Sequence, residues 1–340
     1  SFLREKGLLD QTHVILVGDH GEGLGDHGES EHGFFVYDST LQVPLLVRPA
    51  ASFKPTVKEV AQPVSLIDVM PTVLRLVRLQ IPAQVQGQSL VGLMLDKELP
   101  RQKGLYAETY VPYLQFGWSP QSSFRLGRYK FIHSPRPELY DVIDDPLEME
   151  NLSGENQAIA NEYRKLLEGL ISRYQSADSA EAPVELDMET RAKLATLGYV
   201  SLAPPQSGMP PISGVDPKDR IQAFETYHEL LGKIGNRQAD ESSLREIESL
   251  RGAAPEMQGL KFLEAGVLEH LGRHREAIEK YETVLSESPD NRLARGNLAS
   301  LLLQFGDLDR AEKELKLVLS QDPDDARARN NLAGVYKARG

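Results

Sequence analysis

A glycine-rich loop holds the side chains of this sequence that are best suited to binding a metal ion. Between Asp19 and Gly33 the chain places five carboxylates, three histidines and five glycines, directly after the apolar run 14–17. Carboxylate and imidazole groups are common metal ligands, and glycines let the backbone bend closely around an ion. The stretch predicts a catalytic metal site, with a structural calcium loop and a solvated acidic turn as alternatives.

Asp19 and His20 are the leading ligand candidates within this loop. They follow the predicted strand at once, where the functional groups of α/β sheets gather, and on a turning loop both side chains can face one point. His32 is open between three roles, which are metal ligand, donor to an anionic substrate and proton shuttle. His27 is expected to pack within the loop.

An α/β arrangement is predicted around this loop. The continuous apolar runs 14–17 and 43–47 are typical of strands covered on both faces, and a capped helical pattern follows from Ser65. We therefore expect a largely parallel sheet here. Over about 104–174 the pattern changes to short strands, with a turn at Gly127-Arg128, and to an amphipathic helix over about 156–174, which predicts a small α+β subdomain.

A period of 34 residues runs through the C-terminal third of the chain. The repeated positions are Ala265, Ala299 and Ala333; Gly272, Gly306 and Gly340; and Pro255, Pro289 and Pro323. This period is the signature of tetratricopeptide (TPR) repeats, which are stacked helix pairs forming an all-α solenoid. The segment from about 218 to 255 keeps only the proline phase, so we interpret it as a degenerate first repeat.

Composition excludes several classes of function. The net charge of −12 argues against a nucleic-acid partner or an anionic membrane surface, and no apolar stretch approaches the ~18 residues of a transmembrane segment. The absence of cysteine excludes disulfides, thiolate metal sites and a cysteine-derived nucleophile within these 340 residues. Because the chain does not begin with methionine, we expect it to be a piece of a longer protein.

Several motifs, in register, closely resemble the second half of sulfatases of the alkaline phosphatase superfamily. They are GDHGE at 18–22, LGDHG at 24–28, HG at 32–33, YDSTLQVPLLVRP at 37–49, VSLIDVMPTVL at 64–74, RYKFI at 128–132 and PELYD at 137–141. The resemblance covers about residues 1–175. It implies a partial alkaline-phosphatase-like α/β sandwich with a small α+β C-terminal subdomain.

The resemblance also implies roles for the loop residues. Asp19 and His20 take the position of the Asp-Asn or Asp-His pair that binds the active-site divalent cation, with calcium expected and magnesium or manganese as alternatives. His32 aligns, across a one-residue gap, with a lysine that contacts sulfate in many sulfatases. The formylglycine nucleophile of the family arises from Cys or Ser in a C/S-x-P-x-R motif, and no such motif occurs here. No catalytic residue is therefore identified, and the nucleophile and the remaining metal ligands are expected upstream of residue 1.

These observations predict four segments. Residues 1–100 are expected to be the C-terminal part of a sulfatase-like core, 101–175 its α+β subdomain, 176–217 a linker with a short helix around 188–197, and 218–340 the repeats, of which the last is incomplete.

The leading functional interpretation is a metal-dependent sulfuric ester hydrolase whose TPR tail binds a protein or peptide in its groove. His20, where arylsulfatases commonly have asparagine, favours the phosphonate, phosphodiester or less typical sulfatase branches of this superfamily. A phosphodiester or phosphonate monoester hydrolase is therefore the alternative. A non-catalytic TPR scaffold is the third interpretation.

Overall fold

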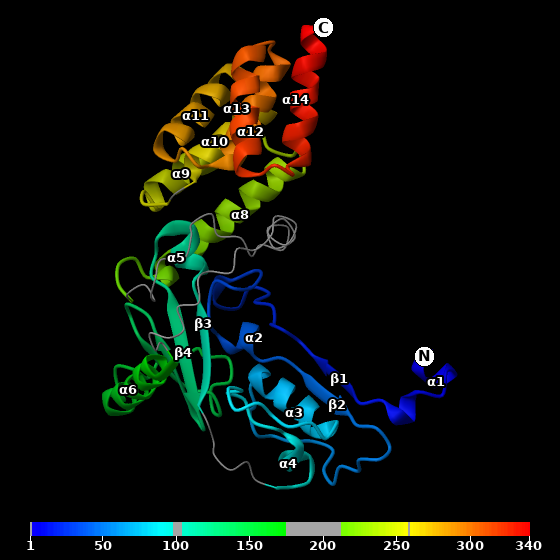
Figure 1. Cartoon of the computed structure of the whole chain (residues 1–340). Coiled ribbons are helices and arrows are strands. Elements are labelled where there is room, and N and C mark those ends of the chain that lie inside the picture. Colours follow the sequence, from blue (N-terminus) through cyan, green and yellow to red (C-terminus); the bar gives the residue numbers. More distant parts are fainter. Residues whose placement is uncertain (1, 98–103, 175–211, 258) are drawn as a thin grey trace. The chain divides into compact units, whose positions relative to one another are not determined.

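The computed structural model describes residues 2–97, 104–174, 212–257 and 259–340 (Figure 1). The chain divides into two compact units, one of residues 1–109 and 120–174 and the other of residues 110–119 and 175–340. The linker expected over 176–217, with its helix around 188–197, falls mostly outside the described residues.

The first unit begins with a two-stranded sheet of β1 (Val14–Val17) and β2 (Leu45–Arg48). The expectation of a largely parallel sheet is wrong for these strands, because they pair antiparallel, with Val14 opposite Arg48 and Val17 opposite Leu45. The amide of Gly18 donates to the carbonyl of Pro44. The chain leaving β1 is thus bonded to the chain entering β2, which must run back alongside it. Apolar runs reveal burial but not strand direction.

The expectation that both faces of these strands are covered is also wrong. Leu16 is 63% exposed and Leu46 is 55% exposed. Short helical elements accompany this sheet in the first unit: α1 (Phe2–Glu5), η1 (Leu9–Gln11), η2 (Asp26–Gly28), α2 (Asp38–Leu41), η3 (Leu66–Asp68), α3 (Val69–Leu76) and α4 (Val91–Met94).

The helix predicted from Ser65 begins with the expected cap. The side chains and backbone of Ser65 and Asp68 form a capping box, in which the amide of Ser65 donates to Asp68 Oδ2 at 3.0 Å. The other oxygen of the same buried carboxylate accepts from the amide of Gln88 at 2.7 Å. Asp68 therefore also ties the start of α3 to the chain that leads into α4.

A four-stranded antiparallel sheet and the helix α6 form the rest of the first unit, in the region where the sequence predicts short strands and an amphipathic helix. Its order is β3-β4-β5-β6, and α6 contacts β4 and β5. The elements are β3 (Leu105–Thr109), β4 (Gln121–Leu126), β5 (Tyr129–His133), β6 (Glu138–Asp141) and α6 (Gln157–Tyr174). Gly127 adopts a φ of +60° in the β4–β5 turn, which glycine tolerates without a steric cost.

Alternation along these strands separates two faces. Phe124, Phe131 and Leu139 pack against Ala160, Tyr163 and Leu167 of α6. The neighbours of these residues along each strand, among them Arg125 and Lys130, therefore lie on the face of the sheet that points away from α6. That face bears on the candidate site.

The second unit is a series of packed helices. Its elements are α5 (Val111–Phe116), η5 (Pro217–Asp219), α8 (Ile221–Gly235), α9 (Glu241–Ala253), α10 (Leu260–His270), α11 (His274–Glu287), α12 (Arg292–Gln304), α13 (Leu308–Gln321) and α14 (Ala326–Arg339). Gly272 and Gly306, at φ of +74° and +80°, end the first helix of two successive pairs.

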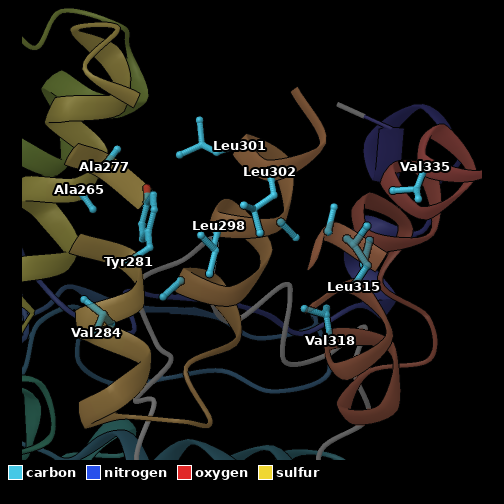
Figure 2. Close-up of a cluster of buried hydrophobic side chains, with 14 of the residues drawn as sticks. Ala265, Ala277, Tyr281, Val284, Leu298, Leu301, Leu302, Leu315, Val318 and Val335 are labelled. Atoms are coloured by element: carbon cyan, nitrogen blue, oxygen red, sulfur yellow. The ribbon is translucent and has the colours of Figure 1, made fainter. Parts of the chain in front are cut away.

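The 34-residue repeat determines the packing of these helices. Ala265, Ala277, Ala299 and Ala311 are fully buried in one apolar cluster with Leu298, Leu315 and Tyr281 (Figure 2). Alanine at these positions lets neighbouring helix backbones approach closely, and the bulky residues of the second helix fill the remaining space. The region is therefore all-α, as predicted.

Candidate functional site

The glycine loop after β1 is a tightly bonded structure rather than an open turn. The amide of Gly21 donates to Thr40 O at 2.7 Å, and that of Gly23 donates to Glu31 O at 2.6 Å. A Cβ atom at Gly21 would lie 2.4 Å from Ser39 O, and one at Gly23 would lie 2.3 Å from Glu29 O. Both positions therefore require glycine, which allows the close backbone approach.

Asp19 and His20, at the start of this loop, hold two potential metal-donor atoms close together. His20 Nδ1 lies 2.8 Å from Gly21 O, so this nitrogen carries the proton and the Nε2 lone pair stays available. His20 Nε2 lies 3.9 Å from Asp19 Oδ1, and the Asp19 side chain is 87% exposed. Bonds from the backbone amides of Asp19 and His20, together with the nearby imidazole, lower the pKa of Asp19. The carboxylate is therefore ionised and accessible.

His32 stacks on the imidazole of His20. The ring centroids are 3.7 Å apart, with an angle of 23° between the planes, and His32 Nδ1 lies 3.3 Å from Glu22 Oε1. The structure thus brings together all three residues singled out as site candidates, Asp19, His20 and His32. Glu22 joins them as the partner of His32.

The remaining histidine and one of the carboxylates hold the loop in place. The ring of His27 stacks on that of Tyr37 at 3.5 Å, and His27 Nε2 lies 3.1 Å from Leu147 O. Burial lowers the pKa of His27. Glu29, which is 1% exposed, accepts hydrogen bonds from the amides of Phe34 and Phe35. These contacts match the packing role expected for His27.

The donor set tests whether a cation fits. Two donors that each lie about 2.0–2.6 Å from one ion can be 3.9 Å apart, so Asp19 and His20 fit as a ligand pair. Within the described residues, no group of three or more His, Asp or Glu side chains is arranged to hold a metal ion. The pair therefore fits as part of a coordination shell.

A buried charge cluster, which sequence reasoning missed, lies on the other face of the β3–β6 sheet from α6. Lys130, with its side chain 2% exposed, places Nζ 2.7 Å from Asp38 Oδ1 and 2.8 Å from Glu148 Oε1. Arg125 Nη1 lies 2.7 Å from Asp38 Oδ2, and the amide of Asp38 donates to Glu148 Oε2. The RYKFI motif was the signal in the sequence that could have indicated this cluster, because it places Lys130 between apolar residues within a strand.

One cavity adjoins both features. It has a volume of about 1050 Å³, and its lining includes Asp19, Asp38, Arg125 and Lys130 together with apolar side chains of β2 and of residues 60–67. The ionised carboxylate of Asp19 lies at the wall of this cavity, where it can accept a cation, whereas Arg125 and Lys130 in the lining are already paired with Asp38 and Glu148.

No helix in the described parts of the chain is long and apolar enough to cross a membrane. This agrees with the absence of a long apolar stretch in the sequence.

Comparison with known proteins identifies both regions. Residues 25–175 match the family described as N-sulphoglucosamine sulphohydrolase, C-terminal, and residues 268–334 match a tetratricopeptide repeat family. The chain is 27% identical to the Δ4,5-hexuronate-2-O-sulfatase of Bacteroides thetaiotaomicron over 56% of its own length and 40% of that protein. It is 26% identical to arylsulfatase K of Xenopus laevis, over 50% of this chain and 33% of that protein.

Among solved structures, the chain is similar to the phosphonate monoester hydrolase of Agrobacterium radiobacter. The identity is 25%, the match covers 50% of this chain and 37% of that chain, and the TM-score is 0.44. The chain thus spans 33–40% of the length of the two curated relatives described above. It carries a sulfatase C-terminal region, of the alkaline phosphatase superfamily, followed by a tetratricopeptide repeat region.

Proposed function

We propose that this chain contributes part of the active site of a metal-dependent sulfuric ester hydrolase. The observation that carries the proposal is the pair of donor atoms on Asp19 and His20, which are 3.9 Å apart at the end of β1. Asp19 would bind the cation through an ionised carboxylate, and His20 through Nε2. When bound, the cation neutralises charge on the ester oxygens.

The neighbouring residues would orient these ligands and the substrate. The carbonyl of Gly21 fixes the His20 tautomer, and the His32 ring holds the imidazole of His20 in place by stacking. His32 lies close enough to this pair to donate to an anionic sulfate or phosphate ester. We expect no turnover by the chain alone, because it contains neither a cysteine nor a Ser-x-Pro-x-Arg motif.

Manganese binding by the whole chain tests the ligand assignment. Enhancement of water-proton relaxation by Mn²⁺ detects weak binding, which is expected from part of a shell, and competition with Ca²⁺ or Mg²⁺ ranks the ions. Asp19→Asn should lower Mn²⁺ affinity by roughly tenfold or more, because changing even an outer-shell partner of a metal ligand typically costs about 10–100-fold. Asp26→Asn, in the same loop, is the matched control. Equal binding by wild type and Asp19→Asn would refute the assignment.

A phosphodiester or phosphonate monoester hydrolase is the second candidate function. It is favoured by the imidazole of His20, because nitrogen donors suit zinc better than they suit calcium or magnesium. Competition distinguishes the two candidates: displacement of Mn²⁺ by micromolar Zn²⁺ but not by millimolar Ca²⁺ favours the phosphoester enzyme, and the reverse order favours the sulfatase.

The repeat region supplies a third element of the proposal, the binding of a protein or peptide partner. Stacked helix pairs create an extended surface suited to this role, and the pairs α10–α11 and α12–α13 form such a stack. A TPR scaffold without catalysis remains the alternative if the metal-binding test fails while partner binding is found.

A further inference from the structure

The connection between β3 and β4 belongs to the helical unit, although both strands belong to the first unit. Residues 110–119 leave the sheet after Thr109, form α5, and return at Pro120. Gly117, at a φ of +73°, ends α5, and Trp118 is the next residue of the chain. Every contact described below lies inside the second unit.

Two aromatic side chains of this connection are buried, and one of them, Phe116, packs against α8. Phe116 and Trp118 are 2% and 0% exposed, and their rings stack with centroids 4.5 Å apart. The ring of Phe116 also meets the rings of Phe224 and Tyr227 edge to face, with centroids 6.0 Å and 5.3 Å apart. Aromatic side chains each bury about 150–250 Å² and gain further from such geometry, so this is a substantial apolar contact.

Hydrogen bonds hold the same segment, residues 110–119, in place. Trp118 Nε1 donates to Glu256 Oε1 at 3.0 Å, and Arg220 Nε donates to the same oxygen at 2.7 Å. Burial acts to raise the pKa of Glu256, but the bonds from Arg220 and Trp118 outweigh it, and the pKa is lowered. The amide of Ser119 donates to Val215 O at 2.9 Å. The Glu256 carboxylate, which follows α9, thus joins Trp118 of the connection to Arg220, which precedes α8.

We propose that residues 110–119 are an internal docking segment that attaches the repeat region non-covalently, in addition to the covalent path through 175–211. Phe116 and Trp118 are the anchors, and the surface formed by α8 and Glu256 is their receptor. The repeat region is therefore held at two points along the chain, and the segment that holds it is continuous with β3 and β4.

Cleavage of the covalent path tests this proposal directly. A specific protease site is inserted within 175–211, the folded whole chain is cut, and the products are analysed by sedimentation at about 50 μM, because interfaces below about 1,200 Å² are usually weak. The two pieces are expected to sediment together. Separation of the cut wild-type protein would overturn the proposal.

Trp118 reports on docking, because it is the only tryptophan of the chain. Its emission should stay at short wavelength after the cut and shift to longer wavelength only when the complex is diluted or denatured. A shift to longer wavelength on cutting alone, at 50 μM, would count against the proposal.

Variants separate docking from folding. Phe116→Ala and Glu256→Gln should each weaken the association of the cut pieces at least tenfold, while the uncut proteins keep their far-UV circular dichroism. Phe305→Ala, at an aromatic that is 55% exposed in the same unit, is the matched control and should change nothing. Association of cut Phe116→Ala as tight as that of the wild type would also overturn the proposal.

Discussion

Replacing Lys130 with methionine should destabilise the β3–β6 sheet strongly. Methionine preserves most of the side-chain volume but removes the ammonium group, which lies 2.7 Å from an Asp38 oxygen and 2.8 Å from a Glu148 oxygen. Asp38 keeps its ion pair with Arg125. Glu148, whose side chain is 1% exposed, loses the only cation that the structure pairs with it within the described residues.

The expected cost follows from this uncompensated charge. Breaking a buried ion pair by removing one partner typically costs 3–5 kcal/mol, and Arg125 softens the loss for Asp38. We therefore expect Lys130→Met to lower the free energy of unfolding of the sheet by about 3 kcal/mol, or roughly 100-fold in the opening equilibrium. Glu148 has a φ of +56°, so the backbone that presents it also costs energy and depends on the cluster.

Native-state hydrogen exchange, read by mass spectrometry on peptides of β4 and β5, measures this loss within one unit of the chain. Lys165→Met, at an exposed position of α6, is the matched control and should change protection by less than about 0.5 kcal/mol. The double variant Lys130→Met/Glu148→Leu should recover much of the loss, because an apolar pair leaves no buried charge.

Two results would refute this reasoning. If Lys130→Met loses less than about 1 kcal/mol of protection, the ammonium group is not compensating a buried charge. If the double variant is less stable than the single one by the full cost of a second core substitution, packing rather than charge explains the effect.

Three further predictions concern the glycine loop, the helical core and the titration of Glu148. Gly23→Ala should destabilise the glycine loop by about 1–3 kcal/mol, seen as faster hydrogen exchange there, whereas Gly154→Ala, which has open space around it, should not. Ala299→Leu should overfill the helical core and cost about 1–3 kcal/mol in urea denaturation, while Ala338→Leu on the exposed face of α14 should be neutral, and equal stabilities would refute the packing argument. Burial raises the pKa of Glu148 above its usual value of 4.5, so its contribution to stability is greatest below that value and falls as pH rises through the folded pKa. Stability measured against pH should therefore fall less steeply, or rise more steeply, in Glu148→Gln than in the wild type, and identical pH profiles of the two proteins would refute this assignment.

Most of the secondary structure follows from local pattern. The strands β3 to β6 lie within the region 104–174 where short strands are predicted, the turn at Gly127 is where turn residues place it, and α6 begins within two residues of its predicted start. The 34-residue spacing of small residues predicted the helical repeats, because each repeat contacts mainly its neighbours and its pattern is local. The residue types of the glycine loop likewise indicated Asp19, His20 and His32 as a group.

Strand direction and the charge cluster did not follow from local pattern. The runs at 14–17 and 43–47 show that both segments are apolar, but only their pairing in the fold, with Val14 opposite Arg48 and Val17 opposite Leu45, establishes that the strands are antiparallel. Asp38 and Lys130 are 92 positions apart in sequence, and each looks like an ordinary charged residue by itself. Spacing cannot show that two such distant residues meet in a buried pair.

The same division holds for the functional features. The period of small residues was sufficient for the repeats, and the resemblance of several motifs to sulfatases was sufficient for the sulfatase-type region, because both depend on residue types at short separations. The ligand candidates stay a prediction from the same motifs. The tautomer of His20, the stacking of His32, the packing of Phe116 on α8 and the bond from Trp118 to Glu256 required the folded chain. Their physical cause is that hydrogen bonds and ring contacts depend on distances of a few ångströms between segments far apart in sequence, which the fold alone brings together.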